Sequence, residues 1–126
     1  MKARNGLLWV GVILIMVTGV VHAIHAPESF EEAVYKGWLF FANIFGSLIA
    51  AYGIFRNRPW GWKLGFLISF ASLILYIASR TIGLTFLPAE PEAWFEPLGV
   101  ISLFSEGLFV VVYVLVIRNS NLLRRK

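Results

Sequence analysis

The sequence predicts an all-α membrane protein, an up-down bundle of four transmembrane helices with both termini in the cytoplasm. Three observations lead to this prediction. Hydrophobic residues make up 59% of the chain and charged residues only 14%, whereas about a quarter of the residues of a soluble domain are charged. A soluble fold of 126 residues keeps much of its surface in water and would not hide so much apolar area. Finally, the apolar residues are gathered in four long runs.

Each run is close to the roughly 20 residues that a helix needs to cross about 30 Å of hydrocarbon. Because lipid cannot satisfy free backbone amides and carbonyls, such runs cross a membrane as helices. None of them alternates polar and apolar residues as a half-buried strand does. We predict one transmembrane domain over residues 1–126, with helices at about residues 6–26, 35–55, 62–83 and 97–118.

The first run has features of a secretory signal peptide. Lys2 and Arg4 precede it, and Val21-His22-Ala23 imitates a small-residue cleavage site. Cleavage there would remove the first helix. Because the run is long enough to span a membrane, we interpret it as a retained helix.

The first two loops are predicted from proline and capping residues. Proline cannot continue a helix, so Pro27 predicts that the first helix ends near Ala26. Ser29 and Glu32 have the spacing of a capping box, which predicts a short amphipathic turn leading into the second helix. The segment 57–61 contains proline and glycine and predicts a tight turn before the third helix.

The last loop leaves one alternative open. In one interpretation Gly83 ends the third helix, and in the other the helix runs on to Leu87 and the prolines that follow stop it. Glu96 and Pro97 predict the start of the fourth helix. Proline suits the first helical position, and a carboxylate suits the positive end of the helix dipole.

The distribution of charge predicts the orientation. Nine of the eleven Lys and Arg residues lie in 2–4, 56–63 and 118–126, whereas six of the seven acidic residues lie in the other two loops. The positive-inside rule therefore places the termini and the second loop in the cytoplasm. Tryptophans are expected at both membrane interfaces. Those predicted at the cytoplasmic interface are Trp9, Trp60 and Trp62, and those at the outer one are Trp38 and Trp94.

Polar side chains within the runs are the candidate functional residues, because lipid makes them expensive. His22, Asn43, Arg80 and Glu106 lie one to a helix, in the outer half or near the middle, and each belongs to a polar stripe. In an up-down bundle such stripes face inward, so we expect a polar core open to the extracytoplasmic side. The candidate ligand-binding cluster consists of His22, Asn43, Tyr76, Arg80, Ser102 and Glu106.

Each of these residues also has a purely structural interpretation. Glu106 would be protonated, or would pair with Arg80 and fix the helix register. Arg80 would snorkel to the outer interface or meet Glu96. Asn43 and the serines would be interhelical hydrogen-bonding groups.

A metal site is a further hypothesis. His22 and His25 are three residues apart, and Glu28 or Glu106 would complete a nitrogen and oxygen ligand set for a divalent metal such as zinc or copper(II). The motif lacks the glutamate of the zinc proteases. Because two histidines on one helical turn do not reach opposite faces of a haem, haem would have to be shared between subunits. Cysteine is absent, which excludes thiolate sites and thiol nucleophiles, and no motif favours an enzyme.

Three motifs occur together in the sequence: His22-x-x-His25-Ala26-Pro27-Glu28-x-Phe30, Tyr76-x-x-Ser79-Arg80-Thr81-x-Gly83-Leu84 and Glu96-Pro97-Leu98-Gly99. In this combination the chain resembles a family of small, functionally uncharacterised four-helix membrane proteins of prokaryotes. The resemblance covers nearly the whole chain. It implies a location in the prokaryotic cell membrane, and it implies no activity.

Three functions of different classes remain open. The first is a binding or redox-accessory module whose polar core holds a metal, a cofactor or a small polar ligand. The second is a structural subunit of a larger membrane complex. The third is a proton- or ion-coupled transporter or channel that uses Glu106 and works as an oligomer. Expected partners are the lipid bilayer and either further copies or other subunits. The net charge of +4 comes from residues at the membrane edges and does not indicate nucleic acid.

Overall fold

The computed structural model describes residues 4–85 and 87–124, and it describes side chains as far as Asn119. Within these ranges the chain is helical, and no residue belongs to a named strand. Four helices are long and apolar enough to cross a membrane, which confirms the predicted all-α class and the predicted number of long apolar helices. The helices are α1 (Asn5–Glu32), α2 (Val34–Phe55), α3 (Pro59–Thr81), the short 3-10 helix η1 (Pro91–Phe95) and α4 (Pro97–Arg124).

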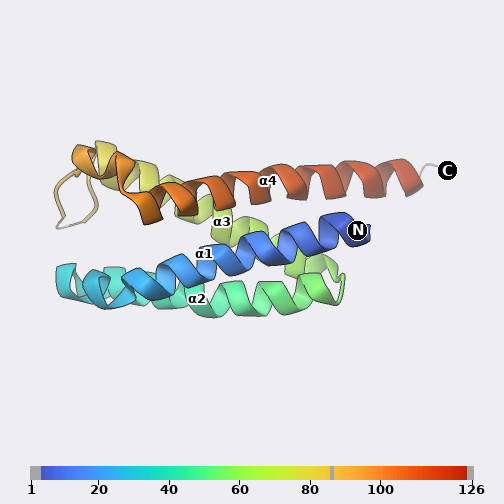
Figure 1. Ribbon diagram of the computed structural model, residues 1–126, viewed down its shortest axis with the longest axis horizontal. Coiled ribbons are helices and arrows are strands. Elements are labelled where there is room, and N and C mark those ends of the chain that lie inside the picture. The colour runs from blue at the N-terminus through green and yellow to red at the C-terminus, as the bar shows by residue number, and fades with distance from the viewer. Residues whose placement is uncertain (1–3, 86, 125–126) are drawn as a thin grey trace.

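The four long helices alternate in direction. Figure 1 places the start of α1 and the end of α4 at one end of the bundle, together with the turn between α2 and α3. We call this the terminal end. The α1–α2 link, η1 and the start of α4 lie at the opposite end, which we call the loop end. Helix α1 packs against α2 and α4, and α3 packs against the same two helices, so the bundle has the predicted up-down order.

Apolar side chains fill the terminal half of the bundle. Ile15, Ile54, Trp62 and Phe109 are fully buried there. Trp62, predicted at the cytoplasmic interface, is fully buried within the bundle, near the start of α3. The absence of a side chain at Gly11 leaves room for the Trp62 indole. The indole stacks on Phe109 with ring centroids 5.9 Å apart.

Helix α1 extends six residues beyond its predicted end, because Pro27 does not end it. Its last turns pack on α2: Phe30 lies over Gly37, where a Cβ would come within 2.2 Å of the ring. This packing offsets the hydrogen bond that a proline removes from a helix, a loss of about 3 kcal/mol. The predicted turn that starts at Ser29 does not form, since Ser29 is buried within α1 and the single extended residue Ala33 links α1 to α2.

The other helix ends follow the sequence more closely. Helix α3 begins at Pro59, three residues earlier than predicted, because proline suits the first turn. It ends before Gly83, which has a φ of 85° and donates its amide to the Ala78 carbonyl. Of the two interpretations, Gly83 as the stop is therefore correct. Helix α4 begins at Pro97 as predicted and extends beyond residue 118.

The closest helix contact at the terminal end predicts the effect of a substitution. A Cβ on Gly61 would lie 2.4 Å from the carbonyl carbon of Gly53 and 2.5 Å from the amide nitrogen of Ile54. Because backbone atoms cannot move aside, Gly61→Ala is expected to lower the free energy of unfolding by about 1–3 kcal/mol. Thermal unfolding in detergent measures this effect. The matched control is Gly107→Ala, whose Cβ meets nothing within 4 Å, and an equal loss in both variants would contradict the packing described.

Candidate functional site

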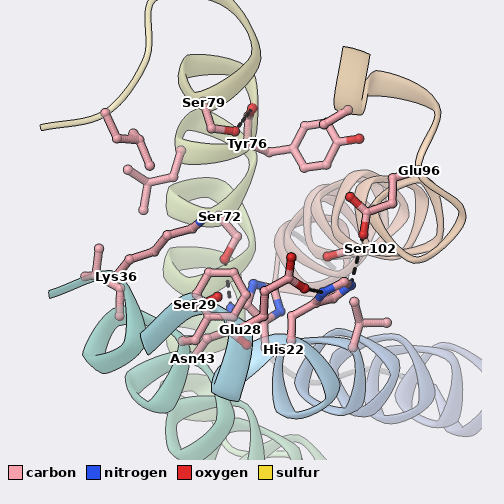
Figure 2. Close-up of a pocket in the computed structure, with 18 of the residues that line it drawn as sticks. His22, Glu28, Ser29, Lys36, Asn43, Ser72, Tyr76, Ser79, Glu96 and Ser102 are labelled. Atoms are coloured by element: carbon pink, nitrogen blue, oxygen red, sulfur yellow. Dashed lines mark hydrogen bonds and ion pairs between the residues drawn. The ribbon is translucent and has the colours of Figure 1, made fainter. Parts of the chain in front are cut away.

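A cavity of about 170 Å³ lies between the four helices in the loop half of the bundle. Its lining includes exposed residues such as Glu28 and Glu96 as well as the buried Ser102 and Glu106, so the cavity runs from an exposed rim to a buried floor. Figure 2 shows labelled side chains from α1, α2, α3 and α4 around this space.

The residues of the floor lie at similar depths on the four helices. His22 is ten residues from the end of α1, and Asn43 is nine residues from the start of α2. Ser72 is nine residues from the end of α3, and Glu106 is nine from the start of α4. At 1.5 Å per residue each lies about 13–15 Å below the loop end of its helix. The residues of the predicted cluster that line the cavity are His22, Asn43, Tyr76, Arg80, Ser102 and Glu106, and His25 lines it too.

Glu106 is the most deeply buried charged side chain of the described residues, with 1% of its surface exposed. The Ser102 hydroxyl, one turn earlier on α4, donates a hydrogen bond of 2.8 Å to Oε1. Oε2 is also buried, and it has no hydrogen-bond partner within the described ranges. A buried polar atom left in this way costs about 1–3 kcal/mol, so the position of Glu106 is not explained by stability.

Arg80 does not neutralise Glu106. Its guanidinium carbon lies 3.7 Å from the centre of the Tyr76 ring, and Nη1 donates to the Ser79 hydroxyl at 2.7 Å. Neither the predicted pairing with Glu106 nor the one with Glu96 is found among the ion pairs of residues 4–85 and 87–119. The physical reason is local: the Tyr76 ring lies one turn away on the same helix and attracts the cation through its π face.

His22 has a defined hydrogen-bonding arrangement. Its Nδ1 lies 2.8 Å from the Thr18 carbonyl oxygen. Because a carbonyl only accepts, Nδ1 carries the proton, and in the neutral ring Nε2 is then the acceptor. The ring packs on Phe40 with centroids 4.8 Å apart. His22 therefore contributes a hydrogen-bond acceptor to the cavity wall.

Asn43 and several hydroxyls hold the helices together. Asn43 donates to Ser72 of α3 at 2.8 Å and accepts from Ser47 at 3.1 Å. Thr18 of α1 shares a hydrogen bond of 2.9 Å with Ser105 of α4. These contacts match the structural interpretation of Asn43 and the serines. The Thr18–Ser105 pair was not predicted, because which hydroxyls meet depends on helix rotations that hydropathy does not define.

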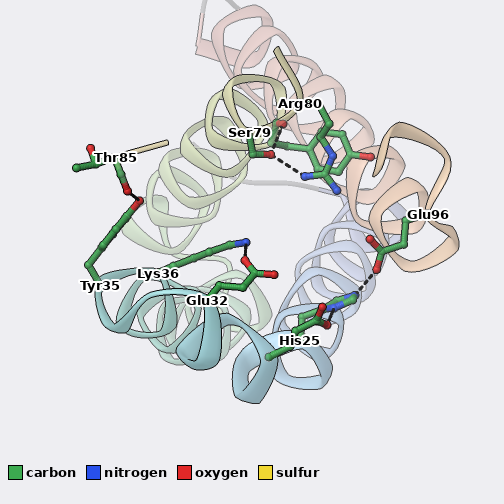
Figure 3. Close-up of polar contacts among 10 residues, drawn as sticks. His25, Glu32, Tyr35, Lys36, Ser79, Arg80, Thr85 and Glu96 are labelled. Carbon is green, nitrogen blue, oxygen red and sulfur yellow. Dashed lines mark hydrogen bonds and ion pairs between the residues drawn. The ribbon is translucent and has the colours of Figure 1, made fainter. Parts of the chain in front are cut away.

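The rim carries polar contacts, and Figure 3 shows them around the opening. His25 lies between Glu28 and Glu96, with nitrogen–oxygen distances of 3.6 Å to each. Lys36 pairs with Glu32, and the Tyr35 hydroxyl donates to the carbonyl of Thr85 in the loop after α3. Apart from His25 and Glu28, which were considered as metal ligands, sequence reasoning did not assign the rim residues to the site. The available signal was their position within two turns of the predicted helix ends.

The proposed metal ligands do not come together. Of the residues that the structure describes, no three His, Asp or Glu side chains are placed to hold one ion. His22 turns Nδ1 toward its own helix, whereas His25 is held at the rim by two glutamates. The set His22, His25 and Glu106 therefore lines one cavity without forming a metal centre.

Comparisons of the chain with protein-family models, with curated proteins and with solved structures find no match. The family resemblance of the three motifs gains no support from them. Interpretation of the cavity accordingly begins from its own residues and their contacts.

The unpaired oxygen of Glu106 predicts that removing this carboxyl stabilises the ligand-free protein. Methionine has a similar length and adapts to irregular space, and the Ser102 hydroxyl can bond a backbone carbonyl of its own helix instead. Glu106→Met is expected to raise the free energy of unfolding by about 1–3 kcal/mol, measured by thermal unfolding in detergent. The control is Phe109→Met, at a fully buried core position, which should be destabilising. A Glu106→Met protein as unstable as this control would contradict the assignment.

Proposed function

We propose that this chain is a multi-pass protein of the prokaryotic cell membrane with both termini in the cytoplasm, and that its cavity binds a small polar ligand from the extracytoplasmic side. The observation that carries the proposal is the Glu106 carboxyl. It lies at the floor of a cavity lined by all four helices, and its Oε2 has no partner within the described ranges. Membrane proteins keep such groups mainly where they work.

The surface of the bundle supports insertion in a membrane. Ile13, Phe45, Leu67 and Phe104, one from each helix, are between 58% and 64% exposed. In water these side chains would form the large apolar patches that soluble proteins avoid. Of the seven basic residues whose side chains the structure describes, five lie at the terminal end, whereas six of the seven acids lie at the loop end where the cavity opens. By the positive-inside rule that opening faces away from the cytoplasm.

The terminal half of the bundle favours binding over conduction. Below the cavity, Ile15, Ile54, Trp62, Phe109 and Val116 are fully buried and close-packed. Such an apolar core provides no polar path for an ion through one copy. Transport with Glu106 as the titrating group would require several copies and a change of packing. That alternative is weaker than binding.

The alternative function, a purely structural role as a subunit of a larger complex, would explain part of the polar interior. The Asn43–Ser72 and Thr18–Ser105 hydrogen bonds join neighbouring helices, as interhelical polar groups do. Such a role does not account for Glu106, whose hydrogen bond from Ser102 stays within α4. Binding is therefore the better proposal, and association with further copies or other subunits stays a prediction. We do not include a metal, because the described residues do not gather its ligands.

Cysteine labelling tests orientation and access together, because the chain has no cysteine of its own. A membrane-impermeant maleimide applied to intact cells is expected to label Ser72→Cys in the cavity and Glu92→Cys on the exposed η1. It should not label Asn5→Cys at the terminal end until the membrane is permeabilised. The matched control is Ser69→Cys, one turn from Ser72 on α3 but fully buried. Labelling of Asn5→Cys but not Glu92→Cys in intact cells would reverse the orientation, and equal protection of positions 72 and 69 would remove the open cavity.

A further inference from the structure

The floor of the cavity presents hydrogen-bond acceptors without matching donors. Oε2 of Glu106 is buried and receives no hydrogen bond from the described residues. His22 donates through Nδ1 to its own helix, which leaves Nε2 of the neutral ring as an acceptor. The Asn43 amide, by contrast, already has Ser72 and Ser47 as partners. A ligand that complements this floor must donate hydrogen bonds.

The charges of the lining favour a cation at the floor, while nearer the rim the Arg80 Nε is buried without a hydrogen-bond partner within the described ranges. Five lining residues are glutamates, and only two, Lys36 and Arg80, are Lys or Arg. Lys36 is paired with Glu32, and the Arg80 guanidinium lies on the Tyr76 ring. Neither cation is within ion-pair distance of Glu106 in the part of the chain that the structure describes. A charged ligand group at the floor would therefore be positive.

The wall between rim and floor is largely apolar. Leu39, Phe40, Leu75 and Leu84 line the cavity together with the Tyr76 ring. The volume of about 170 Å³ is similar to that of an apolar cavity of about 150 Å³ that holds benzene. A bare inorganic cation would leave most of this space and its apolar wall unused. Size and lining both favour an organic ligand with a short hydrocarbon part.

Resting on the proposed function, we propose that the ligand is a small primary ammonium compound with a short apolar tail. Its ammonium group lies at the floor and donates to Glu106 Oε2 and His22 Nε2. It also supplies the positive charge that pairs with the Glu106 carboxylate. Its tail contacts Phe40, Leu75 and the Tyr76 ring. The acidic rim raises the local concentration of such a cation at the opening, as a cleft of one charge sign does.

Calorimetric titration of the full chain in lipid nanodiscs tests this proposal with three probes of nearly equal size: n-butylammonium, n-butanol and n-butyrate. We expect n-butylammonium to bind at least tenfold more tightly than the other two. Glu106→Gln keeps the shape of the side chain and should weaken n-butylammonium binding at least tenfold. The matched control is Glu31→Gln, an exposed acid near the same end that does not line the cavity, with less than a threefold effect.

Each result has a definite meaning. Selective binding of n-butylammonium that depends on Glu106 supports the proposal. Equal or tighter binding of n-butyrate, which the Arg80 guanidinium would favour, or of n-butanol overturns the ammonium assignment and leaves ligand binding in the cavity intact. Equal binding of sodium ion would identify an inorganic cation site and would also overturn it. If none of the three probes binds, the ammonium assignment is overturned as well. If in addition Ser72→Cys is not labelled, the proposed function is also rejected. The comparison of probes uses the native chain, so it does not depend on the folding of a variant.

Discussion

The constraint on which the structure depends is that its helices expose apolar faces outward, so polar side chains find partners only between the helices. Each helix has such a face, and each places at least one polar side chain at the cavity. Lipid offers these groups no hydrogen bonds. The interior therefore collects the polar side chains, and the interhelical Asn43–Ser72 and Thr18–Ser105 hydrogen bonds follow from that. Glu106 is one exception, because its Oε2 is among four buried side-chain atoms that have no partner within the described ranges.

The two halves of the bundle have different roles. In the terminal half, the close approach of Gly53 to Gly61 and the buried Trp62 produce a dense apolar core. In the loop half, polar contacts such as that of His25 with Glu96 join α1 to the start of α4 at the rim. The cavity lies beneath them. The close-packed core of the terminal half thus stabilises the fold. The cavity in the loop half contains the Glu106 oxygen that lacks a hydrogen bond. Functional sites commonly have this relation to the rest of a fold.

Much of this architecture was predictable because hydropathy and helix-end signals are local. The four spans, the start of α4 at Pro97 and the stop at Gly83 followed from composition and backbone preference. The depth of Glu106 followed from helical rise alone. The predicted depth of His22, about 6 Å below Ala26, was too small, because α1 continues to Glu32. What failed depended on side-chain contacts, two of them between helices and one within α3. Pro27 stays helical because Phe30 packs on Gly37, Trp62 is buried because Gly11 leaves it room, and Arg80 lies on Tyr76 because that ring is one turn away. Helix rotation and side-chain rotamer decide such contacts, and neither can be read from periodicity.

The central claim is that the Glu106 carboxyl at the cavity floor receives a ligand. The most direct test is solid-state NMR of the chain in bilayers with ¹³C-labelled glutamate, in which the Glu106 carboxyl signal is assigned by its loss in Glu106→Gln. The chemical shift of this signal is expected to change when n-butylammonium is added and to stay unchanged with n-butanol. A signal unchanged at n-butylammonium concentrations that saturate any calorimetric binding would contradict the claim, because the ligand would then not reach Glu106.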